Sequence, residues 1–498
     1  MNRPRRPTAI VIGAGVAGLA ASIHLARRGF KVDIFEKNTR AGGRLDQIER
    51  EGFRFDTGPT LYVMPQLYAS ELKRLGIEAH AALDLQRVDP TYHLYFEGGS
   101  QLVLTSDMKR LTGQIDRFEH GASKHLMTYL SEGGRHYELA LKNLVQRDFR
   151  RMGDFLNLSN LLLLFQLKAH RKHYRYIGRY FDDHRLQAAF TFQDMYMGLS
   201  PADAPTTFSL MQYSELAHGV WYPRGGMYRI VRLLLKYAED AGVGIHLNSP
   251  VMQIDIDGHQ ALGVTLESGE RVRSDFIIAN ADLPYVYGHL LPQDGTMQRL
   301  QRKRYSCSTI SFFWGLESEV PELEPHMLFL ADDYLGGFQA LNGGSLPERP
   351  SLYVHTPTRL DPTLAPDGRD SVVGIVPVGN LSSQPDADWQ SIRDQARQAI
   401  FDRLATVGVE ELPEQIAFET CFTPYSWRKR YNLVHGATHG LSHTLTQLAY
   451  MRPHNQHRRY KNLYFAGAST HPGTGVPTVL VSGRLAAERI VEVVELRE

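Results

Sequence analysis

The residues that could bind a nucleotide gather near the start of the chain. Gly13, Gly15 and Gly18 form a GxGxxG pattern, and Glu36 stands at the end of the next apolar run. Glycines at this spacing let the backbone approach a pyrophosphate, and an acid at this distance accepts hydrogen bonds from a ribose 2′-hydroxyl while repelling a 2′-phosphate. The pattern predicts a site for FAD or NAD and disfavours NADP.

The sequence around these glycines predicts a strand, a helix and a second strand. Residues 9–12 are apolar and β-favouring, residues 16–28 show helical spacing, and residues 31–36 resume a strand. The amino end of that helix would face the negative charge of the ligand. The expected contacts in this unit are Gly13, Gly15, Val16, Ala17, Gly18, Glu36 and Lys37.

A second open turn follows the ribose acid. Gly42, Gly43 and Arg44 combine flexible backbone with a cation, and residues 56–59 predict another tight turn. A simple NAD domain has no need of this apparatus, which therefore favours FAD. The expected contacts here are Gly42, Gly43, Arg44, Gly58, Pro59, Thr60 and Leu61.

The segment "GASTHPGTGVP", residues 467–477, predicts a further open turn between a buried strand and a helix. Pro477 suits the first helical position because its φ is already fixed. Such a turn would let a flavin ring lie against bare backbone, and the helix end would stabilise the negative charge left by hydride transfer. A helix N-cap with ordinary loop glycines is the alternative. The expected contacts are Gly467, Gly473, Thr474, Gly475 and Val476.

Together these motifs resemble the flavin-dependent amine oxidase and carotenoid desaturase superfamily. More narrowly, "RYSCST", "MRPHN" and "WYPRGGMYRI" are similar to segments of bacterial-type phytoene and diapophytoene desaturases, and the resemblance runs nearly end to end. It implies FAD as cofactor, with further contacts at Val251 and Asn280. It also implies a hydrophobic polyene substrate, phytoene or 4,4'-diapophytoene, and an electron acceptor such as oxygen or a quinone.

The resemblance implies desaturation by hydride transfer to the flavin and leaves other activities open. A carotenoid isomerase or a terminal oxidase would share the cofactor motifs, and a non-catalytic lipid-binding protein would share the architecture. Intact glycines at both ends of the expected flavin site argue against the non-catalytic alternative. The length of the substrate, the number of steps and the oligomeric state are not readable from these residues.

Asp148 and Arg151 are candidates for acid–base work. Their spacing predicts that they share one face of a helix, where the arginine would lower the pKa of the aspartate. A surface ion pair is the alternative from the residues alone, and the resemblance implies an acid–base role. His471, beside the glycine turn, is a further candidate, although a hydrogen-bonded structural histidine fits the position equally well.

Residues 155–165 form the densest apolar run, and five basic residues follow between positions 168 and 179. This combination is typical of a helix lying on a membrane surface, or of a core helix with a solvated basic face. The resemblance favours membrane contact, on the inner face of the cytoplasmic membrane. Residues 190–201 and 305–316 are expected to line a hydrophobic tunnel.

The whole chain is predicted to be an α/β protein of 498 residues, with a Rossmann-like FAD-binding domain interleaved with a mixed-sheet substrate domain and a helical membrane-contacting region. The charges of the 55 basic and 54 acidic residues nearly cancel, so the net charge of the whole chain does not indicate nucleic-acid binding. Cys307 and Cys421 predict neither a disulfide framework nor a metal site. The expected segments are 1–90, 236–290 and 426–498 for FAD, 91–235 for the helical region, and 291–425 for the substrate domain.

Overall fold

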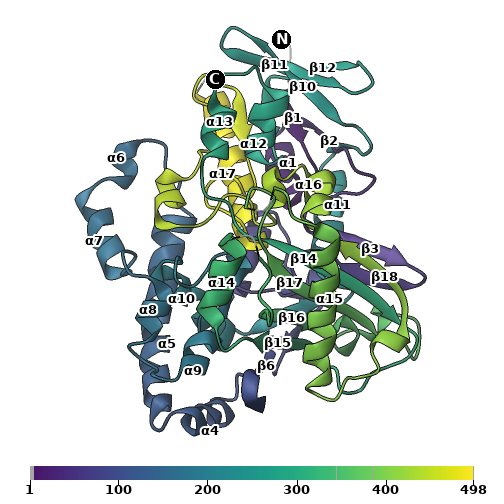
Figure 1. Ribbon diagram of the computed structural model, residues 1–498. Coiled ribbons are helices and arrows are strands. Elements are labelled where there is room, and N and C mark those ends of the chain that lie inside the picture. Colours follow the sequence, from purple (N-terminus) through teal and green to yellow (C-terminus); the bar gives the residue numbers. More distant parts are fainter. Residues whose placement is uncertain (1–4, 344, 384, 497–498) are drawn as a thin grey trace.

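A five-stranded parallel sheet forms the nucleotide-binding end of the molecule in the computed structural model, which describes residues 5–343, 345–383 and 385–496 (Figure 1). Its strands come from distant parts of the chain, so the sheet closes only when the carboxyl-terminal segment joins it. In spatial order they are β19 (Leu463–Phe465), β13 (Phe276–Ala279), β1 (Thr8–Ile12), β2 (Lys31–Phe35) and β9 (Gly244–His246).

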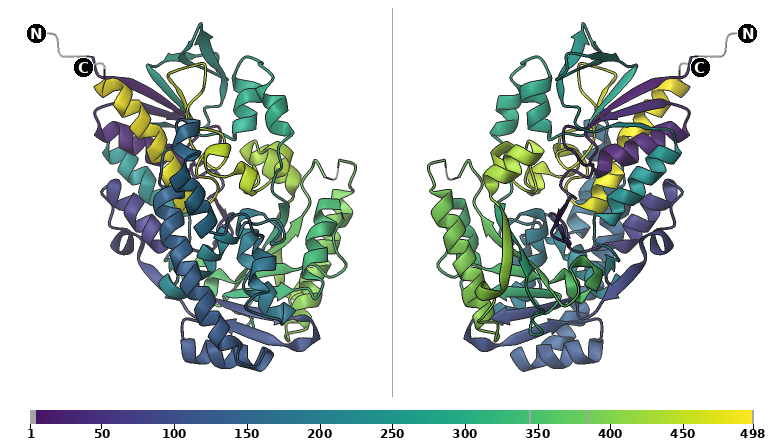
Figure 2. Two further views of the ribbon diagram at one scale, coloured as in Figure 1. Left: turned by 90° about the vertical axis from the view of Figure 1, so that its left-hand side faces the viewer. Right: turned by 90° about the vertical axis from the view of Figure 1, so that its right-hand side faces the viewer.

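Alternate residues of β1 enter two different cores, as successive side chains of a strand must. Val11 packs with three helices on one face, whereas Ile10 and Ile12 pack with a small antiparallel sheet on the other (Figure 2). Burial on both faces explains why these short strands are almost wholly apolar. The helices are α1 (Val16–Arg27), α11 (Arg229–Asp240) and α17 (Val476–Glu495), and the small sheet is β10 (Val251–Asp257), β11 (Gln260–Leu266) and β12 (Arg271–Arg273).

A seven-stranded mixed sheet forms the second layer, with α15 (Trp389–Ala405) packed against one of its faces. β6 and β15 pair in parallel, and the other neighbours are antiparallel. The predicted α/β architecture with mixed sheets is therefore confirmed. In spatial order the strands are β18 (Ile416–Phe422), β14 (Ser308–Leu316), β17 (Ser371–Val378), β16 (Leu352–His355), β15 (His326–Leu330), β6 (Tyr92–Phe96) and β7 (Gln101–Leu104).

Residues 108–213 are mostly helical, and α6 and α7 project from the body at the left of Figure 1. Within the described residues, no helix combines the length and apolarity needed to cross a membrane. The helices are α4 (Met108–Phe118), α5 (Ala122–Ala140), α6 (Met152–Phe155), α7 (Leu158–Gln166), α8 (His173–Ile177), α9 (His184–Ala189) and α10 (Ser209–Tyr213).

Shorter elements connect these layers. β3 pairs with β4, which packs against the mixed sheet, β5 pairs with β8, and α2 contacts α17. The remaining elements are β3 (Gln47–Arg50), β4 (Phe53–Asp56), β5 (Leu85–Val88), β8 (Val220–Pro223), α2 (Pro65–Arg74), α3 (Ala79–Leu83), α12 (Leu283–Tyr285), α13 (Thr296–Gln301), α14 (Tyr334–Gly343) and α16 (Pro424–Tyr431).

Candidate active site and cofactor cavity

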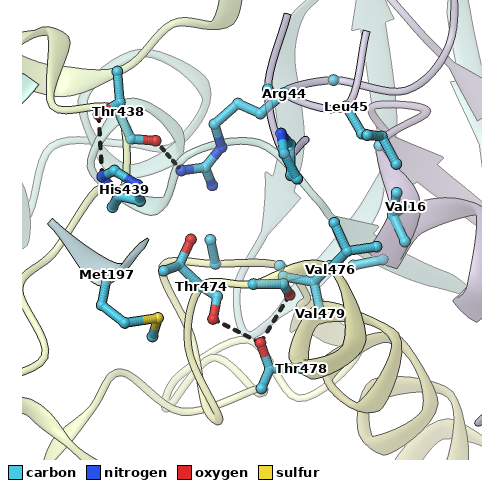
Figure 3. Close-up of a pocket in the computed structure, with 18 of the residues that line it drawn as sticks. Val16, Arg44, Leu45, Met197, Thr438, His439, Thr474, Val476, Thr478 and Val479 are labelled. Carbon is cyan, nitrogen blue, oxygen red and sulfur yellow. Dashed lines mark hydrogen bonds between the residues drawn. The ribbon is translucent and has the colours of Figure 1, made fainter. Parts of the chain in front are cut away.

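One elongated cavity of about 600 Å³ runs between the parallel sheet, the start of α17 and the mixed sheet (Figure 3). Of the residues expected to contact a cofactor, Gly18 and Gly473 do not line it. The others do: Gly13, Gly15, Val16, Ala17, Glu36, Lys37, Gly42, Gly43, Arg44, Gly58, Pro59, Thr60, Leu61, Val251, Asn280, Gly467, Thr474, Gly475 and Val476.

The first glycine turn is packed too tightly for side chains. A Cβ on Gly18 would lie 2.3 Å from the Gly13 carbonyl oxygen, which is backbone and cannot move aside. The second turn is held beside the first because the Gly42 amide donates to the Ala14 carbonyl at 2.8 Å. Gly18 therefore shapes the site without facing it, since its role is to let α1 approach the turn.

Glu36 is fixed in place by the backbone around it. One carboxylate oxygen accepts from the Ala14 amide at 2.9 Å, and the other accepts from the Asn38 amide at 2.9 Å. The side chain is only 5% exposed and lines the cavity. Each oxygen keeps a second lone pair, so the carboxylate can still accept from a ribose hydroxyl.

Asn280 joins the first glycine turn to the turn before α17, and we call these two turns together the cofactor cradle. Its Nδ2 donates to the Gly13 carbonyl at 3.2 Å, and its Oδ1 would lie 2.9 Å from a Cβ placed on Gly467. One amide side chain thus fills the space that glycines leave open in both turns. The sequence placed Asn280 near the cofactor but did not predict this bridging position.

The carboxyl-terminal turn combines left-handed backbone with a helix end that lacks a cap. Gly467, Gly473 and Gly475 have φ values of 109°, 136° and 112°. α17 begins directly after Gly475, with no side-chain cap and no acid in its first turn. The amide donors of this helix end are consequently left for a ligand, and its dipole favours negative charge in the cavity.

Arg452 fastens this turn to the preceding loop. The buried guanidinium donates to five backbone carbonyls, and among the described residues it forms no ion pair with a carboxylate. Burial, followed by the nearby charge of Arg44, lowers the pKa of Arg452 to about 9. The accepting carbonyls are those of Leu441, Ser442, Gln447, Ala468 and Thr470. The sequence did not predict this role of Arg452. The only sign of it was that Arg452 lies in "MRPHN", one of the segments that resemble the desaturases.

Two buried histidines contact the same turn in defined tautomers. His443 Nε2 accepts from the Thr474 amide at 3.0 Å, so its proton is on Nδ1. His471 Nε2 lies 2.9 Å from the Arg147 carbonyl and must donate to it, so its Nδ1 is unprotonated. Burial lowers the pKa of both, that of His471 to about 4, and among the described residues neither Nδ1 has a hydrogen-bond partner.

Arg44 lies across the cavity from this turn, where Figure 3 shows it beside Thr438 and His439. Its guanidinium donates to the Thr438 carbonyl at 2.9 Å. Burial raises the pKa of the neighbouring Asp282, although the Ser469 hydroxyl and Arg44 oppose that shift. Arg44 therefore gives this part of the cavity wall a cation that would favour negative charge on a bound cofactor.

The predicted pairing of Asp148 with Arg151 is wrong. Residues 147–150 are not helical, so the spacing of three does not bring the two side chains together. Asp148 instead binds Arg489 of α17 and Arg150, the latter at 2.6 Å, whereas Arg151 is exposed at the start of α6. Burial acts to raise the pKa of Asp148, but the bonds to Arg489 and Arg150 outweigh it and lower the pKa. Asp148 does not line the cavity.

Both segments expected to line a tunnel line the cavity, but only residues 190–201 contribute a mainly apolar wall, since residues 305–316 contribute Cys307, Thr309 and Ser311. Residues 192 and 195–197 line the cavity, as do residues 307, 309 and 311. Apolar side chains of the helical region continue this wall away from the glycine turns. They include Ala140, Leu144, Val145, Phe208, Leu210 and Met211. The helical region thus extends the cavity with mainly apolar side chains, whereas Glu36, Lys37 and Arg44 line it near the glycine turns.

FAD fits the cradle that the residues build. The start of α1 has neither a side-chain cap nor an acid in its first turn, which suits a pyrophosphate. Glu36 lies at one end of the continuous cavity, and the uncapped start of α17 lies at another. Within the described residues, no group of three or more His, Cys, Asp or Glu side chains could hold a metal ion.

Comparison with known proteins agrees with this geometry. Residues 16–491 match the model of the flavin containing amine oxidoreductase family, and the chain belongs to that family. A zeta-carotene-forming phytoene desaturase of Myxococcus xanthus is 40% identical over 97% of this chain and 93% of its own. A 4,4'-diapophytoene desaturase of Staphylococcus haemolyticus is 34% identical over 97% of this chain and 99% of its own.

Solved structures share the fold at lower identity. Wild-type putrescine oxidase bound to putrescine has a TM-score of 0.63 at 15% identity, covering 98% of this chain and 99% of that one. A fatty acid isomerase from P. acnes has a TM-score of 0.60 at 14% identity, covering 98% and 99%.

Proposed function

We infer that the protein is an FAD-dependent desaturase that introduces double bonds into a linear carotenoid precursor, phytoene or 4,4'-diapophytoene. One observation carries this inference: a single cavity joins the complete flavin cradle to an apolar extension. A hydrocarbon offers no hydrogen bonds, so a wall of Met, Leu and aromatic side chains selects it by length and shape. The desaturases among the relatives support the same reaction.

FAD, when bound in this cradle, would supply an acceptor for the hydride that desaturation removes. The chain contributes the electrostatics of that step. The uncapped start of α17 faces the cavity, and Arg452 stands behind the turn as a buried cation. Both favour negative charge in the cavity without needing to reorganise during the reaction. The electrons then pass to an acceptor such as oxygen or a membrane quinone.

The substrate enters from the inner face of the cytoplasmic membrane, on which the protein lies peripherally. Support comes from a surface that we call the apolar rim, on α6, α7 and the segments at 445 and 451. Its large side chains are 41% to 72% exposed, so the run 155–165 is not a core helix. The rim consists of Met152, Leu156, Leu158, Leu161, Leu162, Phe165, Leu445 and Met451.

The apolar rim is continuous with the cavity wall. Leu163, on the inner side of α7, packs in one cluster with Ala140, Leu144 and Leu210, and these three residues line the cavity. Exposed basic side chains border the rim and match the anionic headgroups of the inner leaflet, at about 1 kcal/mol for each residue near the surface. They are Arg151, Arg171, Lys172, Arg175 and Arg179.

Anaerobic reconstitution tests the reaction. The purified protein is loaded with FAD, mixed with liposomes containing phytoene or 4,4'-diapophytoene, and followed by flavin absorbance and pigment chromatography. Bleaching of the flavin with formation of longer conjugated polyenes is expected for one of the substrates. Unchanged bond counts would instead indicate an isomerase or a lipid-binding protein, and an aldehyde would indicate a terminal oxidase.

Liposome sedimentation tests the membrane contact. Leu161→Glu combined with Phe165→Glu should reduce binding to anionic liposomes at least about tenfold. The reason is that two apolar side chains that become buried in the bilayer contribute ~3 kcal/mol or more to binding. Met252→Glu is the matched control, since Met252 is 52% exposed on β10. Binding that survives the double substitution, or that Met252→Glu weakens equally, would contradict the rim as the contact surface.

A further inference from the structure

His439 lines the cavity close to Arg44 and to the mainly apolar segment 190–201. Figure 3 shows its imidazole beside Thr438 and Met197, across the cavity from Val16. The absence of a side chain at Gly198, whose φ is 63°, makes this contact possible, because a Cβ there would lie 2.7 Å from His439 Nδ1. His439 thus borders both the flavin cradle and the wall that receives the hydrocarbon.

The hydrogen bonds around the ring are compatible with a tautomer whose Nε2 is free. His439 Nδ1 lies 3.1 Å from the Thr438 hydroxyl, which can donate its own proton to the Cys307 carbonyl at 3.5 Å. In that arrangement Nδ1 carries the proton and donates to Thr438 Oγ1. Nε2 is left with a lone pair. Within the described residues it has no partner, and it is not among the buried unpaired atoms, so it is open to the cavity.

The charges around His439 keep the ring neutral. Burial, and then the guanidinium of Arg44, lower the pKa of His439 to about 4. Arg44 is held close because it donates to the Thr438 carbonyl. Asp282 lies nearby, but its carboxylate is occupied by the Ser469 hydroxyl and the Val434 amide. At neutral pH the imidazole is therefore ready to accept a proton.

The other candidates cannot take this role in the structure. His443 and His471 line the cavity, but the unpaired Nδ1 of each is buried, and in His443 that atom carries the proton. Asp148 lies outside the cavity and is held by two arginines. Glu36 stands at the ribose end of the cavity, with both oxygens bound to backbone amides.

We propose that His439 is a catalytic residue of the desaturase, whose Nε2 accepts the proton released from the polyene. The role rests on the desaturase function inferred above. One C–H bond breaks as a hydride leaves for the flavin, which is thereby reduced by two electrons. The adjacent C–H bond gives its proton to Nε2, and its electron pair forms the new C=C bond. A weak base suffices, because the positive charge that develops as the hydride leaves makes the adjacent hydrogen strongly acidic. Proton and hydride leave together in this proposal, so the rate of flavin reduction depends on the base.

Single-turnover reduction of the loaded protein tests this role. His439→Gln and the wild-type protein are compared under anaerobic conditions in liposomes containing the polyene that the wild type converts. We expect unchanged FAD content and thermal melting, with flavin bleaching slowed by about 100-fold, as loss of a positioned general base predicts. His439→Ala should be equally slow and should regain at least about tenfold with free imidazole. His454→Gln is the matched control, since His454 does not line the cavity.

Two results would overturn the assignment while leaving the desaturase intact. One is bleaching of His439→Gln within about twofold of the wild-type rate, far below the loss expected of a general base. The other is a loss of activity that is fully explained by lost FAD, without imidazole rescue. Absence of bleaching in the wild-type protein with either polyene would overturn the desaturase function together with this role.

Discussion

At the scale of single residues, the cofactor cradle depends on glycines, because there is no room for a larger residue at these positions. Gly18→Ala would place a Cβ 2.3 Å from the Gly13 carbonyl oxygen and 2.8 Å from Asn280 Nδ2. We expect a loss of about 1–3 kcal/mol of folding free energy from overpacking, together with loss of bound FAD because both contacts belong to the cradle. Flavin absorbance of the purified protein and urea unfolding measure the two effects.

Gly113→Ala is the matched control for that substitution. Gly113 lies within α4, and apart from its chain neighbours and the backbone of its own helix, no described atom lies within 4 Å of the position its Cβ would take. Alanine should therefore stabilise the helix by about 1 kcal/mol and leave FAD content unchanged. Equal FAD retention by both variants would contradict the tight packing of the first turn.

Residues such as these were predictable from the sequence to different degrees. Glycines in a fixed pattern report a local backbone requirement, so Gly13, Gly15 and Glu36 could be assigned from their spacing alone. Arg452 and His439 could not, because their partners are backbone carbonyls, a hydroxyl and a cavity brought together from distant segments. Nothing in a local pattern specifies which carbonyl a buried guanidinium will meet.

At the scale of elements, the loop after α5 is fastened to α17 by charge. Asp148 binds Arg489, whose side chain is only 7% exposed, so Asp148→Asn leaves a largely buried cation without its partner. We expect destabilisation of about 2 kcal/mol, less than for a fully buried pair because Asp148 is 18% exposed. Thermal or urea unfolding measures it.

A double-substitution cycle separates this structural role from catalysis. Arg489→Met in the Asp148→Asn background removes the unpaired cation and should recover most of the lost stability. If desaturation recovers with it, Asp148 acts through the fold. Activity that stays low while stability returns would contradict this and restore the acid–base role for Asp148.

The α5–α6 connection also shows where element prediction failed. A spacing of three residues suggests a shared helical face only if the helix exists, and here the chain leaves the helix before Asp148. The arginine that matters is 341 positions away in sequence. Strand–turn–helix units with strong local signals, by contrast, were predicted correctly at residues 8–35.

At the scale of the whole molecule, buried neutral histidines make stability depend on pH. Burial is the main reason that the pKa values of His136, His355 and His471 fall to about 4. The unfolded chain binds protons near pH 6.5, so between pH 6.5 and 4 it holds more protons than the folded state, and stability falls as the pH falls. Each histidine contributes at most about 3 kcal/mol.

Urea unfolding between pH 7 and pH 4.5 measures this dependence. The free energy of unfolding should decline steadily over that range, and His136→Gln should flatten the decline because it removes one of the groups that titrate. His120→Gln is a matched control, since His120 is exposed. A free energy that stays constant down to pH 4.5 would contradict the burial of these rings in neutral form.

The order of the strands in the parallel sheet has a consequence for cofactor binding during protein synthesis. Ribosomes deliver the amino-terminal nucleotide turn before β19 and the turn before α17, which follow every other strand of this sheet. Until then Asn280 faces no second turn, and the nascent chain offers only half a cradle. A complete cradle therefore exists only after β19 and the turn before α17 have been synthesised, and a chain halted before Leu463 would lack the second half of the flavin contacts.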